Sequence, residues 1–404
     1  MESSNDGQSR QATENQSLRQ RPMRIGIDYT AAVRQGGGIG RYTRNLVRAL
    51  AKLDTRNRYT LFVAGGWGAG DGLGSWPPNF RVRSFPLSDR WLTILWQRLR
   101  LPIPIQAVTG PLDLFHSPDF VLPPTGSATS ILTIHDLSFS RLPDCYVPAF
   151  QQYLQAAVSR SVRRAHWILA DSESTRRDLV DRMGIDPGRS LVVYPAVEGR
   201  FQPVQDTQLL AEVRRRYHLP ERFILGLGTI QPRKNFVGLI KGFQRLLQAK
   251  GKSADLENLN LVIGGERGWL FQETLDSAAQ AGLEGRVHFP GFIADEDLPA
   301  LYSLARVFAF PSWYEGFGLP VLEAMASGTP VVAADNSSLP EAVGEAGLMV
   351  PAGDSDALAQ ALARILTDKD LRQRLVQAGF EQARRFSWEQ SAARLLQLFQ
   401  ACGG

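Results

Sequence analysis

Short apolar runs alternate with segments of helical periodicity along most of the chain. Residues 24–28 (Arg-Ile-Gly-Ile-Asp) are typical of a buried parallel strand, and a glycine-rich loop then leads into residues 41–53, whose apolar side chains recur at helical spacing. This alternation predicts a mostly parallel sheet covered by helices on both faces. Further strands are predicted at 59–64, 112–115, 130–134, 167–170 and 190–194, with helices at 150–164 and 174–183.

The pattern pauses near residue 198, where Phe201-Gln202-Pro203 is typical of a linker, and a second alternating series follows. We therefore predict two doubly wound domains, residues 23–200 and 201–385, with the carboxyl ends of both sheets facing one cleft. The second series has predicted strands at 223–228, 259–264, 286–289, 307–311 and 330–334 and helices at 236–250, 270–282, 295–304, 318–327 and 357–367.

The chain ends differ from these two series. Residues 386–404 contain an amphipathic helix at 388–399 that comes after the second sheet is complete, so we expect it to pack back on the first domain. Residues 1–22 are polar and mixed in charge, which predicts a disordered tail. This tail lacks the apolar core of a signal peptide, and no run reaches the ~18 apolar residues of a membrane span. Cys145 and Cys402 are too few for a disulfide framework, which favours free thiols and a cytoplasmic location.

Charge is distributed unevenly between the two series. Residues 24–200 carry 22 lysines and arginines against 14 aspartates and glutamates, whereas residues 201–404 carry 20 against 23. The basic half suits a phosphorylated acceptor or the inner face of a membrane, contacted peripherally, although a solvated surface explains it equally well. Nucleic acid is disfavoured because aromatic residues are not interleaved with the basic ones. Residues 91–100, basic and amphipathic, could touch a membrane or a lipid acceptor, or form a core helix.

The first candidate for ligand binding is the loop Gly36-Gly37-Gly38-Ile39-Gly40. Consecutive glycines let the backbone approach a ligand closely, and the start of the following helix favours an anion. The spacing is not GxGxxG, which argues against a dinucleotide site. A flexible turn is the structural alternative.

The second candidate is the string Gly226-Leu-Gly-Thr-Ile-Gln-Pro-Arg-Lys-Asn235, between a predicted strand and a helix. Arg233 and Lys234 suit a diphosphate, because arginine binds as a fork and lysine as a point charge. A solvated pair is the alternative. The string lacks GxxxxGK[ST], which argues against a nucleoside triphosphatase loop.

The third and most specific candidate is the segment 311–332, which contains Glu315 and Glu323 seven residues apart, before and inside a predicted helix. The two carboxylates should lie at different depths of one pocket, where each can accept hydrogen bonds from vicinal hydroxyls of a sugar or a ribose. The backbone N–H groups of Phe317, Gly318 and Leu319 open the helix and could hold a phosphate. Two surface glutamates are the alternative.

Two histidines follow successive predicted strands. His116 and His135 could therefore point into the cleft and hydrogen-bond a ligand, with packing or capping as the alternative. Histidine, cysteine and acidic residues nowhere show the spacing of a metal site, so we expect neither a protein-held metal nor another cofactor.

Taken together, these strings resemble glycosyltransferase family 4, the large retaining family with the GT-B fold of two Rossmann-like domains. The resemblance covers about residues 23–400. It rests on Gly-Gly-Ile-Gly-Arg-Tyr at 37–42, on Gly-Thr-Ile-Gln-Pro-Arg-Lys-Asn at 228–235, and on the Glu315 and Glu323 signature with its downstream Gly-Thr-Pro-Val. Ile-His-Asp-Leu at 134–137 and Asp-Ser-Glu-Ser-Thr at 171–175 are similar to a mannosyltransferase-like branch.

The resemblance implies roles for the candidate residues. Arg233 and Lys234 would bind the diphosphate of a nucleotide-sugar donor and stabilise the leaving group in place of a metal. Glu315 would contact hydroxyls of the donor sugar, and Glu323 would hold the ribose. His135 would lie beside the donor sugar and help to position it.

The resemblance also implies a second group of donor contacts. Gly37 and Gly38 would close over the diphosphate from the other domain, and Ile293 would lie near the base. Residues 317–319 would supply backbone donors. Thr229 stands where many relatives carry an additional arginine.

The activity implied is transfer of a hexose, with mannose from GDP-mannose as the first choice, to a glycan or lipid-linked acceptor. Three alternatives remain: a UDP-glucose-type donor, a sugar-nucleotide epimerase or hydrolase, and a non-catalytic sugar-nucleotide-binding protein on the same fold.

Overall fold

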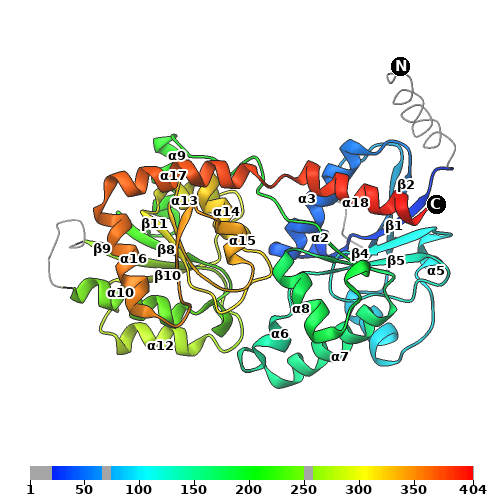
Figure 1. Ribbon diagram of the computed structural model, residues 1–404, viewed down its shortest axis with the longest axis horizontal. Coiled ribbons are helices and arrows are strands. Elements are labelled where there is room, and N and C mark those ends of the chain that lie inside the picture. The colour runs from blue at the N-terminus through cyan, green and yellow to red at the C-terminus, as the bar shows by residue number, and fades with distance from the viewer. Residues whose placement is uncertain (1–20, 66–73, 250–257, 404) are drawn as a thin grey trace, which may run out of the picture.

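A computed structural model of the chain describes residues 21–65, 74–249 and 258–403. All but two residues of the tail predicted at 1–22 lie outside the described residues. The described chain forms two α/β halves that lie side by side (Figure 1), each with a parallel sheet between layers of helices.

The first half is built on a seven-stranded parallel sheet with the order β3-β2-β1-β4-β5-β6-β7. Its strands are β1 (Arg24–Asp28), β2 (Arg58–Ala64), β3 (Phe80–Phe85), β4 (Leu114–Ser117), β5 (Thr129–Ile134), β6 (Trp167–Ala170) and β7 (Ser190–Val192). Its helical elements are α2 (Thr30–Arg34), α3 (Gly38–Leu53), α4 (Asp89–Thr93), η2 (Ile94–Arg98), α5 (Gln106–Thr109), α6 (Ser138–Arg141), η3 (Pro143–Cys145), α7 (Pro148–Arg164), α8 (Glu173–Met183) and η4 (Pro187–Arg189).

The second half is built on a six-stranded parallel sheet with the order β10-β9-β8-β11-β12-β13. Its strands are β8 (Arg222–Leu227), β9 (Leu259–Gly264), β10 (Val287–Gly291), β11 (Val307–Phe310), β12 (Val331–Ala334) and β13 (Gly347–Val350). Its helical elements are α9 (Thr207–Arg216), η5 (Pro232–Lys234), α10 (Phe236–Gln248), α12 (Gln272–Gln280), α13 (Leu298–Leu304), α14 (Leu319–Ala326), α15 (Leu339–Val343), α16 (Ser355–Thr367) and α17 (Lys369–Arg384).

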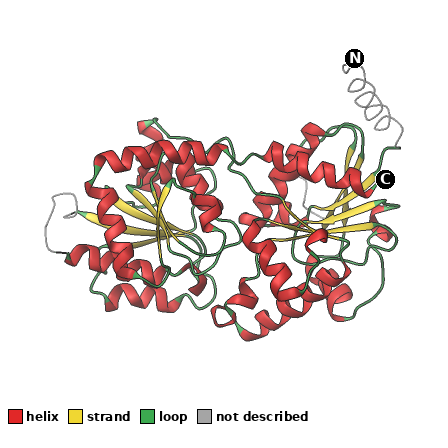
Figure 2. Cartoon of the chain, in the orientation of Figure 1, coloured by secondary structure: helices red, strands yellow, loops and turns green. Residues whose placement is uncertain are grey.

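Both sheets are covered on two faces (Figure 2), which explains their nearly continuous apolar strands. Successive side chains of a strand point to opposite faces. Leu114 therefore belongs to the apolar cluster on one face of the first sheet and its neighbour Phe115 to the cluster on the other. The predicted fold class, two doubly wound α/β units, is confirmed.

The last helix, α18 (Trp388–Cys402), returns to the first half, as predicted. It packs against α3, where the rings of Trp388 and Tyr42 are 5.8 Å apart. Figure 1 shows α17 and α18 as one red stretch that passes from the second half to the first. The proposed domain boundaries at 200/201 and 385/386 stay a prediction.

Several elements differ from the prediction. The edge strands β3 and β13 and the helices α9, α15 and α17 were not expected. The helix predicted at 41–53 begins at Gly38, with Gly37 as its N-cap, so three of the loop glycines lie at the helix start. Phe201, predicted in a linker, is buried, with the guanidinium of Arg41 5.2 Å and that of Arg200 4.8 Å from its ring centroid.

The strand order places the candidate residues. In each sheet the direction of winding reverses beside the central strand, at β1/β4 and at β8/β11, and ligands of such sheets bind beyond the carboxyl ends there. The string 226–235 follows β8 and the string 311–332 follows β11. Both predicted donor motifs therefore lie at the switch point of the second sheet.

Candidate active site

The loop after β8 is held in place by its own sequence. Asn235 adopts a left-handed conformation and caps α10 by accepting a hydrogen bond from the N–H of Gly238 at 3.2 Å. Its side-chain amide donates to the carbonyls of Pro311 at 3.0 Å and of Ala352 at 2.7 Å. Asn235 thus ties the loop after β8 to the loop after β11 and fixes the position of the neighbouring Lys234.

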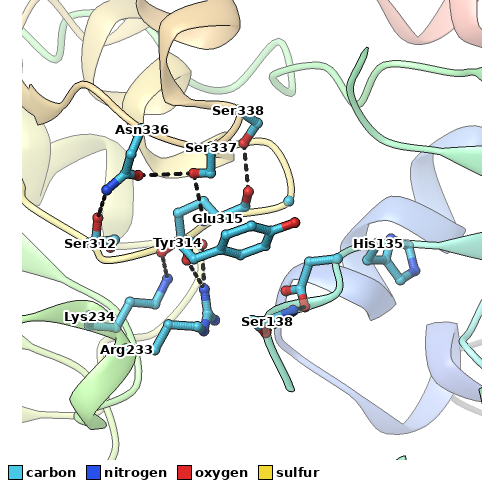
Figure 3. Close-up of polar contacts among 12 residues, drawn as sticks. His135, Ser138, Arg233, Lys234, Ser312, Tyr314, Glu315, Asn336, Ser337 and Ser338 are labelled. Atoms are coloured by element: carbon cyan, nitrogen blue, oxygen red, sulfur yellow. Dashed lines mark hydrogen bonds and ion pairs between the residues drawn. The ribbon is translucent and has the colours of Figure 1, made fainter. Parts of the chain in front are cut away.

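Arg233 and Lys234 converge on one carboxylate (Figure 3). Arg233 Nη1 lies 2.8 Å from Glu315 Oε2, and Lys234 Nζ lies 2.7 Å from Glu315 Oε1. Arg233 also donates to the carbonyl of Tyr314 at 2.7 Å. Lys234 is 9% exposed and Glu315 7% exposed, so the cluster is nearly dry and each charge is paired.

Burial and pairing set the charge of this cluster. Burial alone would raise the pKa of the Glu315 carboxyl, but the adjacent Arg233 and Lys234 outweigh burial and lower that pKa to about 2. Burial lowers the pKa of the Lys234 ammonium, against the attraction of Glu315. With all three groups ionised, the cluster carries one surplus positive charge for an anionic ligand.

Two serines after β12 hold the backbone of Glu315. Its N–H donates to Ser337 Oγ at 3.0 Å, and its carbonyl accepts from Ser338 Oγ at 2.8 Å, as Figure 3 shows. The carboxylate is therefore positioned from its own main chain as well as by the two cations.

Glu323 lies on the second turn of α14 and is 1% exposed. Its carboxylate accepts a hydrogen bond from the hydroxyl of Tyr302 at 3.0 Å and forms a 2.5 Å ion pair with Arg41 of α3. Arg41 also pairs with Glu198 at 2.8 Å. One arginine of the first half therefore joins the two halves at Glu323.

His135 follows β5, at the carboxyl edge of the first sheet. Its Nδ1 lies 2.7 Å from Asp171 Oδ2 and its Nε2 lies 2.8 Å from the carbonyl of Pro118, so both ring nitrogens are engaged within the protein. Burial disfavours the charged ring, but the ion pair with Asp171 outweighs burial and raises the pKa of His135 to about 9. Neither ring nitrogen is free to hydrogen-bond a ligand in this conformation, so the positioning role of His135 stays a prediction.

The two halves touch where Gly316 meets His135. A Cβ atom on Gly316 would lie 2.0 Å from the His135 carbonyl oxygen, so only glycine fits. Thr175 Oγ1 bridges the same place, 3.2 Å from the Gly316 carbonyl and 3.3 Å from that of His135. Nearby, the carboxylate of Glu341 accepts from the backbone N–H groups of Glu173 at 2.9 Å and Ser174 at 2.7 Å, at the start of α8.

The remaining predicted donor contacts surround this cluster. Gly318 has φ 109° and precedes α14, whereas the Phe317 side chain packs on Phe386, with ring centroids 5.1 Å apart. Leu319 is half-buried, and Ile293 is buried beside the carboxyl end of β9. Exposed positions are Gly37, Gly38 and Thr229.

His116, the other histidine considered, is a packing residue. Its Nε2 lies 2.9 Å from Thr133 Oγ1, and burial lowers the pKa of the ring to about 3. Among the residues that the structure describes, no group of three or more histidine, cysteine, aspartate or glutamate side chains could hold a metal ion.

A cavity of about 950 Å³ lies between the halves, beside the Arg233 cluster. It is lined mainly by the first half, from Asp28 to Leu154, and from the second half by Arg233 and Trp269. A ligand in this cavity would therefore contact the carboxyl edge of the first sheet and a cation of the second half at once.

Several functional side chains had no assigned role in the sequence analysis. Arg41 lies in the quoted Gly-Gly-Ile-Gly-Arg-Tyr string, and its partner across the cleft could not be inferred from that string. Asp171 could have been found, because it follows β6 as His135 follows β5, and adjacent parallel strands bring such residues to one edge. Tyr302, Ser337 and Ser338 carry no sequence signal of their own.

Comparison with known proteins identifies both halves. A family model described as Glycosyltransferase Family 4 matches residues 36–199, and one described as Glycosyl transferases group 1 matches residues 212–382. The chain is 32% identical over 288 residues to O-antigen chain mannosyltransferase B of Escherichia coli, covering 71% of this chain and 74% of that protein. It is 38% identical over 248 residues to D-inositol 3-phosphate glycosyltransferase of Salinispora tropica, covering 59% of this chain but only 51% of that protein.

Solved structures show the same fold at low identity. Sucrose-phosphate synthase from Thermosynechococcus elongatus superposes with a TM-score of 0.72 at 22% identity, covering 94% of this chain and 98% of that one. Anabaena Alr3699/HepE in complex with UDP-glucose gives 0.71 at 19% identity, covering 94% and 100%. WaaG, a glycosyltransferase involved in lipopolysaccharide biosynthesis, gives 0.68 at 14%, covering 93% and 99%.

The fold, the paired family matches and the relative that is similar over most of both chains agree with the motifs at the switch point. The chain is a retaining glycosyltransferase of family 4, with the GT-B fold and a nucleotide-sugar donor.

Proposed function

We propose that the protein transfers a hexose, with mannose from GDP-mannose as the first choice, to a glycan or lipid-linked acceptor. One observation carries the proposal: Arg233, Lys234 and Glu315 form a buried cluster with a surplus positive charge at the switch point of the second sheet. O-antigen chain mannosyltransferase B and the serotype-specific mannosyltransferase WbdA of Escherichia coli, both 32% identical, support mannose.

In the proposed reaction, the bond between the anomeric carbon and the diphosphate oxygen breaks as the carbon gains oxocarbenium character. Arg233 and Lys234 stabilise the charge that develops on the leaving diphosphate, and they need no reorganisation because Glu315 already fixes them. The acceptor hydroxyl attacks the same face, and its proton passes to the leaving phosphate oxygen. We expect the rate to be unchanged by a chelator; loss that magnesium restores would contradict this role of the two cations.

The other donor contacts follow the same arrangement. Glu315 binds hydroxyls of the sugar, and Glu323 binds the ribose, whose hydroxyls would share or replace the ion pair with Arg41. Ile293 lies near the base, and Thr229 lies near the phosphates. The backbone of residues 317–319 donates to the sugar and the phosphate, while Gly37 and Gly38 close over the diphosphate.

His135 acts as a positioning residue in this proposal. Its ring is held by Asp171 and by the Pro118 carbonyl, and its own carbonyl lies against Gly316, next to Glu315. A rigid ring at this place orients the backbone against which the donor sugar closes.

The decisive experiment is a panel of nucleotide sugars tested by thermal shift and by turnover with an oligosaccharide acceptor. We expect GDP-mannose to raise the melting temperature most and to be consumed only with acceptor. A larger rise in melting temperature with UDP-glucose would identify the donor as UDP-glucose and not GDP-mannose. Consumption without acceptor would favour an epimerase or hydrolase, and binding with no consumption would favour a non-catalytic protein.

A peripheral membrane contact through the first half fits one surface. The segment 91–100 packs on the core through Leu92, Leu95 and Trp96, as the core-helix alternative expects. Trp91 is 58% exposed and Leu99 61% exposed, with Arg90, Arg98 and Arg100 beside them in the chain, so these side chains remain for a membrane contact. None of the described helices is long and apolar enough to cross a membrane. We expect sedimentation with anionic vesicles that weakens with salt and with W91A; equal sedimentation of W91A would refute this surface. A cytoplasmic location stays a prediction.

A further inference from the structure

The carboxyl edge of the first sheet presents acidic side chains to the cavity. Asp28 ends β1, Asp119 follows β4 by two residues and Asp136 follows β5 by two residues. Because β1, β4 and β5 are neighbouring parallel strands, their carboxyl ends bring these carboxylates to one edge. All three are half-buried and line the 950 Å³ cavity.

Charge in the cavity is therefore predominantly negative, although the first half is basic overall. Four carboxylates line it, those of Asp28, Asp89, Asp119 and Asp136, against two cations. Arg34 is already paired with Asp89 at 3.5 Å, and Arg233 with Glu315 at 2.8 Å. The arginine excess of the first half thus belongs to other surfaces.

Burial is the main influence on the protonation of this edge, and the neighbouring carboxylates add to it. Burial, with the nearby charges of Asp119 and Asp89, raises the pKa of Asp28 to about 6. Burial also raises the pKa of Asp119, although the nearby charge of His135 acts in the opposite direction. A further anion at this edge would meet the same unfavourable field.

Another part of the cavity lining, here called the aromatic wall, consists of aromatic side chains. Tyr146, Phe150 and Trp269 form a cluster, with the Trp269 ring centroid 5.3 Å from that of Tyr146 and 5.9 Å from that of Phe150. Trp269 comes from the second half and donates to the carbonyl of Cys145 at 2.6 Å, which fixes its ring over the cavity. Trp96 lines the cavity as well.

The geometry points to an uncharged hexosyl residue as the reacting end of the acceptor, in contact with both the acidic edge and the aromatic wall, and to the exclusion of phosphorylated acceptors. Carboxylates accept hydrogen bonds from sugar hydroxyls, and aromatic rings pack on the apolar face of a pyranose. This assignment rests on the proposed function, since the cavity adjoins the Arg233 cluster where the donor would react. It favours a sugar-elongating reaction over transfer to a sugar phosphate or inositol phosphate.

The test measures binding of the acceptor sugar without donor, so that a wrong donor assignment cannot affect it. Two of the eight tryptophans, Trp96 and Trp269, line the cavity, so the tryptophan fluorescence of the full chain is titrated with methyl glucoside, galactoside and mannoside and with the corresponding hexose 6-phosphates. We expect at least one neutral hexoside to bind, and its 6-phosphate to bind at least about tenfold more weakly.

Variants assign the effect to the acidic edge. D119N and D28N should each lower the affinity for the neutral hexoside about fivefold to tenfold, with an unchanged melting curve as the check on folding. They should also reduce the ratio of hexoside affinity to 6-phosphate affinity. D181N, an exposed carboxylate on α8 outside the cavity, is the matched control and should change neither value. Binding of the 6-phosphate as tight as the hexoside, no binding of any neutral hexoside, or unchanged hexoside affinity in both variants would overturn the inference.

Discussion

The two walls of the cleft are built in different ways. The wall of the second half consists of two short strings after β8 and β11, in which backbone hydrogen bonds and ion pairs fix Arg233, Lys234 and Glu315. The wall of the first half draws single side chains from loops and helices between Asp28 and Leu154. Under the proposed function this difference has a reason: local charge and backbone groups suffice to bind a diphosphate sugar, whereas recognition of an acceptor by shape and stacking needs contributions from many segments.

The largest expected effect lies on the wall of the second half, which we propose binds the donor and therefore call the donor wall. K234A and E315A should each lower turnover by a factor of 100 or more, on the order of 3 kcal/mol, because either change breaks the preorganised charge at the leaving group. The factor by which kcat falls should be the same for every acceptor, and it is measured with several different acceptors, each at saturation.

The matched control for K234A is K241A, an exposed lysine on α10 in the same half. It should retain full turnover. Near-normal rates in folded K234A or E315A would contradict the assigned roles. If the loss of turnover in K234A or E315A differed from one acceptor to another, the donor and acceptor roles could not be divided between the two walls.

The second largest effect on turnover is expected at the contact between the two halves, at Gly316. G316A places a methyl group 2.0 Å from the His135 carbonyl oxygen, so the halves cannot close to the same distance. We expect turnover to fall about tenfold to 100-fold while the thermal shift caused by the donor persists, because the donor wall itself is intact.

G285A serves as the control for G316A, because a Cβ atom at Gly285 meets nothing within 4 Å. Unchanged turnover in G316A would show that the contact between Gly316 and His135 is not needed for the reaction.

The smallest effect concerns stability of the first half. The pKa of His135 is about 9 in the folded protein, above its ordinary value of 6.5, so the ion pair with Asp171 stabilises fully below about pH 6.5 and is lost as pH rises through 9. The free energy of unfolding should decrease by on the order of 2 kcal/mol across this window.

H135Q should flatten this dependence in urea melts at pH 6 and pH 9. H218Q, which alters an exposed histidine of the second half, should leave the pH dependence of the free energy of unfolding unchanged. An identical slope in H135Q would refute the assignment of the proton to His135.

The difference between the walls also explains what the sequence could predict. The elements around the donor wall were predicted almost in full, because β8 and β11 are central apolar strands and their motifs are continuous. The edge strands β3 and β13 were missed, although the other two edge strands, β7 and β10, were predicted, so the reason lies in the two sequences themselves. β3 alternates exposed arginines with apolar residues, and β13 is a short Gly-Leu-Met-Val run.

The acidic edge of the first half, which we propose contacts the acceptor, could not be predicted for a physical reason. Asp28, Asp119 and Asp136 are separated by up to 108 positions and meet only because β1, β4 and β5 are neighbours in the sheet. The overall positive charge of the first half even suggested the opposite sign for this surface. The order of the strands in the sheet, which depends on contacts between distant parts of the chain, brings the three aspartates to this edge.

The return of α18 to the first half means that the chain passes between the halves twice, near Phe201 and again near Phe386. A single connection would allow swivelling in every direction. Two connections leave essentially one axis of rotation, roughly along the line that joins them. We therefore expect any rotation of one half against the other to be restricted to that axis, and removal of residues 388–404 to release this restraint and uncover the apolar side of α3.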